Sequence, residues 1–211
     1  MPQAGYQCHR LHAILDRLEE EARRMLQLEA QISAFAIEYY EAVGTAVMRL
    51  IALEQVEHEP LWQAAREMGM ARNAELKWRY RTLAKEMHPD RAGSHTLPTQ
   101  MHQLNAAYRQ GDLAALLRLE AQWSLMKHEG AALVTAFAEV EAATQTYVNA
   151  YRMLLRCPLY ELMQRSSAAG RAGADWMAEV RLHIEERIAQ AQREYARANI
   201  AAISAWREAA A

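Results

Sequence analysis

Apolar residues recur every three or four positions along three long stretches of the chain, which is the repeat of an amphipathic α-helix. The first stretch, from Tyr6 to Glu57, contains no proline and one glycine, Gly44. Spacings of four and three alternate along it, as in a coiled coil, and only Glu29 interrupts the stripe. The stripe consists of Leu11, Leu15, Leu18, Ala22, Met25, Ile32, Ala36, Tyr39, Val43, Ala46, Leu50 and Leu53. A helix this long is not stable alone in water, so we expect a partner helix.

The other two long stretches lie in the C-terminal half. One runs from Leu113 to Arg156, with Gly130 as a weak point and Pro158 beyond its end. A short helix is expected over 159–166, and a last long helix over 174–208. The apolar stripe of this last helix consists of Met177, Val180, Ile184, Ile188, Ala191 and Tyr195. Long helices joined by short connections pack antiparallel, so we expect a bundle or coiled-coil hairpin.

The segment between these stretches has shorter helical runs, separated by prolines and glycines. A short helix is expected at Leu61–Met68, and a second begins near Asn73, a residue type that caps helices. The second helix must end before Pro89, because the residue preceding proline avoids the helical conformation. Gly111 and Asp112 mark the start of the next long stretch, since glycine favours the position after a helix and aspartate caps the following one.

The helix before Pro89 has two distinct faces. Its apolar face, which we expect to be buried, consists of Leu76, Tyr80, Leu83 and Met87. Its cationic residues, spaced four apart and turned away from the apolar face, are Lys77, Arg81 and Lys85. A further short helix, Pro98–Gln110, has an apolar face of Met101, Leu104, Ala107 and Tyr108. The sequence therefore predicts two short antiparallel helices joined by a loop.

This helical pair resembles the J domain of DnaJ-type co-chaperones. The run from Leu76 to Arg91 looks like helix II of a J domain, and Leu104 to Tyr108 looks like the part of helix III that packs on it. The loop contains the family's signature tripeptide, His88-Pro89-Asp90. Composition alone would place this tripeptide in such a chain only about 0.004 times. Met101 and Ala92 depart from the family pattern, which usually has an aromatic residue and an asparagine there.

The resemblance covers about a quarter of the chain. The glycine/phenylalanine-rich linker and the cysteine-rich zinc module of larger DnaJ proteins are absent, so the chain looks like a member of the simplest class. Its long helical flanks are similar to those of bacterial J proteins with coiled-coil arms.

The resemblance implies docking on the ATP-bound form of a DnaK-type chaperone and stimulation of its ATP hydrolysis. The cations can steer the chain toward an acidic surface. The aspartate of the tripeptide can pair with an arginine of the chaperone, while the proline limits the freedom of the loop. The expected chaperone-binding residues are His88, Pro89, Asp90, Lys77, Arg81, Lys85, Tyr80 and Arg91.

Composition narrows the function classes further. The 211 residues carry a net charge of −2, so we expect no nucleic-acid partner. Two cysteines, Cys8 and Cys157, give neither a disulfide framework nor a four-cysteine zinc site and fit a reducing compartment. No apolar run is long enough for a signal peptide or a membrane span. No nucleophile–base pair or phosphate-binding loop is visible, so we expect neither an enzyme nor a cofactor or metal site.

We therefore expect an all-α protein of the bacterial cytoplasm with three parts: a coiled-coil helix at 1–58, a J domain at 59–112 inserted at one tip, and a helical hairpin at 113–211. The expected function is that of a co-chaperone with helical arms for positioning. The alternative is a helical adaptor whose J-like tip does not engage a chaperone. The apolar stripes fit an intramolecular bundle best, but they also fit a homodimer or the binding of a client protein.

Overall fold

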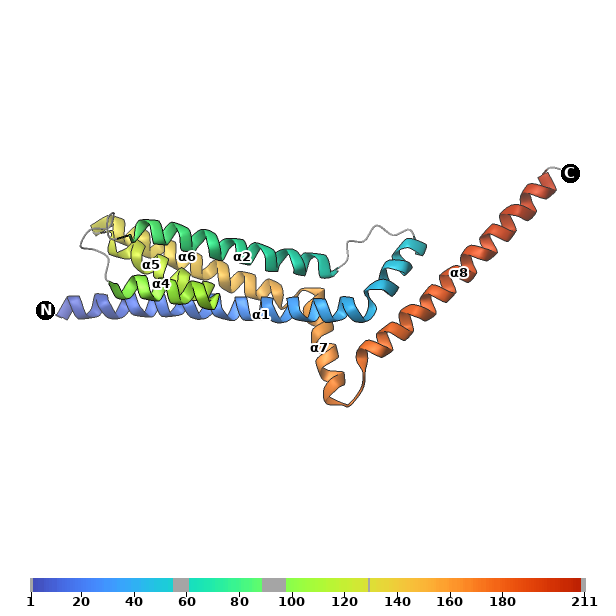
Figure 1. The fold of residues 1–211 in the computed structure, drawn as a ribbon, viewed down its shortest axis with the longest axis horizontal. Helices are drawn as coiled ribbons and strands as arrows, with labels where there is room; N and C mark the ends of the chain where they lie inside the picture. The colour runs from blue at the N-terminus through green and yellow to red at the C-terminus, as the bar shows by residue number, and fades with distance from the viewer. Residues whose placement is uncertain (1, 55–60, 89–97, 129, 210–211) are drawn as a thin grey trace. The chain divides into compact units, whose positions relative to one another are not determined.

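The computed structural model describes residues 2–54, 61–88, 98–128 and 130–209, and all regular secondary structure in these ranges is helical (Figure 1). The helices are α1 (Pro2–Glu54), α2 (Leu61–Glu86), α4 (Pro98–Gln110), α5 (Leu113–Met126), α6 (Gly130–Leu154), α7 (Pro158–Arg171) and α8 (Trp176–Ala209). The predicted all-α class is confirmed. None of these helices is long and apolar enough to cross a membrane.

The segment expected to hold two helices is one helix, α2. Gly69 and Asn73 lie inside it, so the predicted break after Met68 and the predicted N-cap at Asn73 are wrong. A glycine in a helix costs only about 1 kcal/mol relative to alanine, and good helix formers surround Gly69. No proline interrupts the helix before its end at Glu86.

The stretch from Leu113 to Arg156 is likewise two helices rather than one. The break falls after Met126, and Gly130 is the first residue of α6. The predicted start of α5 is confirmed, because the Asp112 carboxylate accepts a hydrogen bond from the backbone N–H of Ala115 at 3.0 Å. Gly111 has a φ of 68°, a left-handed conformation that glycine adopts without strain.

The chain divides into two compact units. Unit 1 comprises Met1–Gln31 and Glu67–Cys157, and unit 2 comprises Ile32–Arg66 and Pro158–Ala211. The helix α1 therefore contributes its first part to one unit and its second part to the other.

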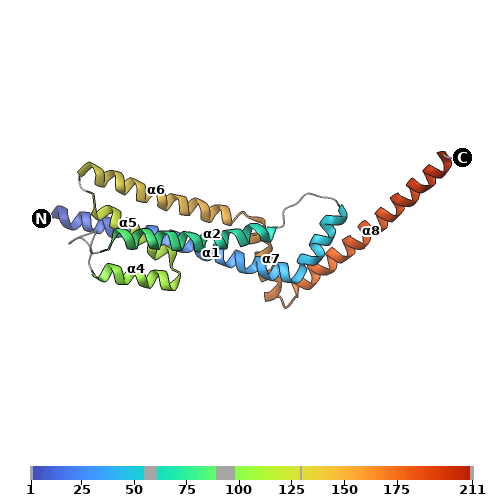
Figure 2. The same ribbon diagram turned by 45° about the horizontal axis from the view of Figure 1, so that its top comes forward.

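In unit 1, the apolar stripe of α1 packs against α5 and α6. Leu15 and Leu18 share a buried cluster with residues of both helices, and Ala22 packs at the start of α5. Figure 1 and Figure 2 show α6 running alongside the first part of α1. The α5 and α6 members of the first cluster are Ala121, Leu125, Ala136 and Val140. The stripe thus finds its partner helices within the same chain.

In unit 2, the second part of α1 packs against α8. Val43, Ile184 and Ile188 form the buried cluster. Trp176, the first residue of α8, lies against Phe35 with ring centroids 6.4 Å apart, and Arg187 pairs with Glu54 at 2.6 Å. Residue numbers rise together along both helices, so α8 and α1 run in the same direction. Antiparallel packing is expected for long helices joined by short connections, and α1 and α8 are not joined in this way.

Candidate functional site

The predicted helical pair is formed by the second half of α2 and by α4. Leu83 and Met87 of the α2 segment share a buried cluster with Leu104 and Ala107 of α4. The rings of Tyr80 and Tyr108 stack with their centroids 4.1 Å apart. Their faces therefore meet as the spacing of apolar residues predicts, and the two helices run in opposite directions.

The hydroxyl of Tyr80 forms a hydrogen bond within the α2–α4 pair. It donates a hydrogen bond to the side-chain oxygen of Asn105 at 2.9 Å, and the tyrosine is half-buried. Tyr80 thus fixes the spacing between α2 and α4, and its expected contact with a chaperone stays a prediction.

A third helix completes the core of this pair. Leu116, Leu119 and Trp123 of α5 belong to the same buried cluster, and Leu116 has no exposed surface. The separate helix predicted at Leu61–Met68 is the first part of α2, and the helix that covers the pair is α5, which follows α4. The spacing of three and four between these α5 residues is visible in the sequence, yet it does not say which helix they cover.

Polar contacts also fix α2 on α5. Arg79 binds Glu75 on its own helix at 2.8 Å and pairs with Glu120 on α5. Near the end of α2, the Glu86 carboxylate accepts a hydrogen bond from the Trp123 indole N–H at 3.1 Å and from Lys127 at 2.5 Å. The hydrogen bond from Lys127 lowers the pKa of Glu86. These contacts set the rotation of α2 about its axis.

With α2 in this rotation, its cationic residues face outward. Lys77, Arg81 and Lys85 are all exposed, and no carboxylate among the described residues forms an ion pair with them. Two carboxylates lie in the second half of α2, and each forms an ion pair with another cation: Glu75 with Arg79, and Glu86 with Lys127. The outer face of this helix therefore carries positive charge that none of the described carboxylates compensates.

The end of α2 lies directly beside this face. The backbone N–H of Met87 donates to the carbonyl of Leu83 at 2.8 Å, and the Met87 side chain is 1% exposed. The buried methionine anchors the last turn, and the next residue, His88, is exposed. Pro89, Asp90 and Arg91 lie outside the described residues. Five of the expected site residues thus lie on α2 and at its end, and four of them are exposed: Lys77, Arg81, Lys85 and His88.

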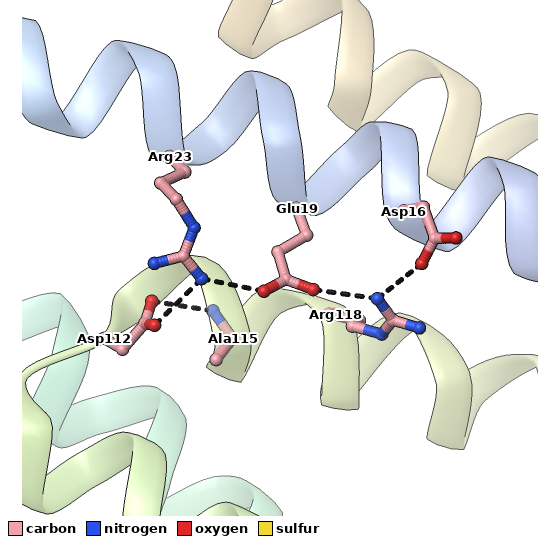
Figure 3. A network of polar contacts seen from close by, with 6 residues as sticks. All are labelled: Asp16, Glu19, Arg23, Asp112, Ala115 and Arg118. Carbon is pink, nitrogen blue, oxygen red and sulfur yellow. Dashed lines mark hydrogen bonds and ion pairs between the residues drawn. The ribbon is translucent and has the colours of Figure 1, made fainter.

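An ion-pair network holds α1 against the beginning of α5 (Figure 3). Arg23 on α1 binds Glu19 at 2.7 Å and the capping carboxylate of Asp112 at 2.9 Å. Arg118 on α5 reaches back to Glu19 at 2.9 Å and to Asp16 at 2.5 Å. Partly exposed pairs contribute about 1 kcal/mol or less each. Their geometric effect is to join α1 to the turn between α4 and α5.

A second feature of unit 1 is an apolar groove of about 470 Å³ between α1, α2, α5 and α6. Glu29, the polar interruption of the α1 stripe, lines this groove and is only 8% exposed. Burial raises the pKa of its carboxyl group, and the charge of Arg72 partly opposes this effect. Tyr147 lines the same groove, and burial raises its pKa to about 12. Among the described residues, no group of histidine, cysteine and acidic side chains could hold a metal ion.

Replacement of Glu29 by glutamine is expected to stabilise unit 1 at neutral pH by on the order of 1 kcal/mol, because it removes a buried charge whose burial outweighs its attraction to Arg72. A carboxyl group whose pKa is raised by folding binds its proton more tightly in the folded state. The wild type should therefore lose stability as the pH rises from the ordinary value of 4.5 through the raised pKa. Urea unfolding at pH 5 and pH 7.5 measures this difference.

The matched control is Glu20→Gln, at an exposed carboxylate on the same helix. It should change the free energy of unfolding little at either pH. A Glu29→Gln variant as sensitive to pH as the wild type in this range would show that Glu29 is not the group responsible.

Comparison of the chain with models of protein families, with curated proteins and with solved structures gave no match. The residues of the α2–α4 pair and their arrangement are therefore the guide to a function.

Proposed function

We propose that this protein is a co-chaperone that docks on the ATP-bound form of a DnaK-type chaperone and stimulates its ATP hydrolysis. The observation that carries the proposal is the outward cationic face of α2, which leads directly into the exposed His88 at the start of the signature tripeptide. A buried hydrophobic core and fixed ion pairs hold this face in position.

The three cations act together. Lys77 and Lys85 are eight residues apart, which corresponds to roughly 12 Å along a helix. This is close to the Debye length of about 8–10 Å at physiological ionic strength, so their fields overlap. A concentrated positive field speeds encounter with an acidic surface, and the effect weakens as salt is added.

The tripeptide supplies the specific contact. Proline restricts the backbone of the loop and so lowers the entropy lost on binding. The carboxylate of Asp90 can form a charge-assisted hydrogen bond with an arginine of the chaperone, which is strong where water is excluded. In this proposal, the cations orient the chain, and the loop delivers the signal for hydrolysis.

The proposal includes a place in the cell and a role for the remaining helices. A reducing bacterial cytoplasm, where DnaK-type chaperones are found, fits the two-cysteine composition. Unit 2 and the long helices would position the docking surface or select a client protein. The chain itself would carry no catalytic residue, cofactor or metal.

An adaptor without chaperone contact is the second candidate. It is favoured by one observation, the continuity of α2 through the region where the J-domain resemblance calls for a separate helix. In that case the α2–α4 pair is a rigid part of unit 1, and the helices alone bind partners.

Single-turnover ATP hydrolysis by a DnaK-type chaperone separates the two candidates. We expect the wild type to accelerate hydrolysis, and His88→Gln and Asp90→Asn to abolish the acceleration, because the loop contact is lost while the core is untouched. Arg81→Ala should weaken it and reduce its dependence on salt.

The matched control is Arg197→Ala, which removes an exposed arginine from α8 in unit 2. It should stimulate as the wild type does. A folded wild type that does not accelerate hydrolysis would contradict the co-chaperone proposal and favour the adaptor.

A further inference from the structure

We propose that Trp78 is an apolar anchor of the same docking surface and that it binds an apolar spot within an acidic surface of the chaperone. This inference rests on the proposed function and extends it to a residue outside the expected binding set. Trp78 is 60% exposed, although tryptophan is highly buried on average.

The position of Trp78 on α2 places it beside the cations. At 100° per residue, Lys85 lies about 20° and Arg81 about 60° from Trp78 around the helix axis. Met70, which is also largely exposed, lies two turns before Trp78 and about 80° from it. One face of α2 therefore combines exposed apolar surface with positive charge.

The indole ring is held where it lies. The guanidinium carbon of Arg79 is 5.8 Å from the centroid of the Trp78 ring, within the range of a cation–π contact. Arg79 is itself fixed by Glu75 and by Glu120 of α5. An indole ring whose orientation is already fixed in the free protein loses less entropy on binding than a mobile ring.

The chemistry of this face selects the kind of partner. Tryptophan and arginine are the residues most enriched at the energetic centres of protein–protein interfaces. The cations require a partner of opposite charge, and the indole requires an apolar contact that excludes water. A single-stranded nucleic acid could also stack on an exposed indole. The net charge of −2 and the small number of cations on α2 favour an acidic protein surface.

The continuous α2 makes this contact possible. Because the helix does not begin near Asn73, its outer face extends well before the three cations. The surface available to the partner thus includes Trp78 and Met70 on the same rigid element as His88.

The test is the concentration dependence of stimulated ATP hydrolysis, measured with the full chain. We expect Trp78→Ala to raise the half-maximal concentration about tenfold, as for a moderate hot spot, and to leave the maximal rate unchanged. Trp78→Phe should retain part of the affinity. His88→Gln, by contrast, should lower the maximal rate. The matched control is Tyr195→Ala, which removes an exposed aromatic ring from α8 and should change neither value.

Each outcome decides the inference. Trp78 is mostly exposed, so its variants should keep the helical content and melting temperature of the wild type, which circular dichroism checks. A half-maximal concentration equal to that of the wild type overturns the anchor but leaves the proposed function intact. A wild type without any stimulation overturns both. Competition by a single-stranded oligonucleotide at constant ionic strength, lost in Trp78→Ala, would assign the surface to nucleic acid instead.

Discussion

Leu116→Ala is expected to lower the free energy of unfolding of unit 1 by about 2–5 kcal/mol, the usual range for a leucine truncated in a core. Leu116 has no exposed surface and belongs to the cluster that joins α5 to the α2–α4 pair. The truncation leaves a cavity between these helices, which cannot close while Arg79 and Glu86 hold α2 in place. Urea unfolding followed by circular dichroism measures the loss.

The expected functional effect follows from the same contact. If α5 holds α2 and α4 together, Leu116→Ala should also reduce the stimulation of ATP hydrolysis, although Leu116 is fully buried and cannot touch the chaperone itself. Leu182→Ala is the matched control, because Leu182 is 59% exposed on α8. Equal losses of stability in both variants would show that α5 does not form the core of the pair. The predicted domain 59–112 ends before α5 and so omits three members of this core.

Ile188→Asp is expected to release α8 from the second part of α1, at a cost of more than about 2 kcal/mol. Ile188 forms a buried cluster with Val43 and Ile184. The aspartate of the variant would therefore place a charge among apolar side chains that cannot pair with it. Hydrogen exchange should accelerate in α8 and in residues 32–54. Exchange in unit 1 should not change, because the core clusters formed by its described residues contain no residue of α8.

Ile200→Asp on the same helix is the matched control, because Ile200 is exposed. It should leave exchange as in the wild type. Faster exchange in residues 67–86 and in α4 of the Ile188→Asp variant would contradict the expectation that only unit 2 is affected. If stimulation of the chaperone persists in this variant, unit 2 is not needed for docking and is left for positioning or client binding.

Much of the candidate site could be predicted from local pattern. The spacing of Leu83 and Met87 on α2, and of Leu104 and Ala107 on α4, marks the faces that are buried against each other. An outward cationic stripe follows from the same periodicity, since residues on the opposite side of a helix face away from the core. Trp78 lies on the same outer side, about 140–180° around the helix axis from the apolar face, so its exposure follows from the spacing although tryptophan is highly buried on average.

The sequence by itself determined the all-α class, most of the helical segments, the cap at Asp112 and the faces of α2 and α4. These features depend on the propensities and spacing of residues a few positions apart, which can be read from the sequence directly. Only the tertiary structure decided that α5 covers the pair, that Glu29 lies buried in a groove and that α8 runs in the same direction as α1. An apolar stripe shows which side of a helix avoids water. The stripe does not show which other helix will cover it or whether the two helices run parallel or antiparallel, because the hydrophobic effect is non-directional.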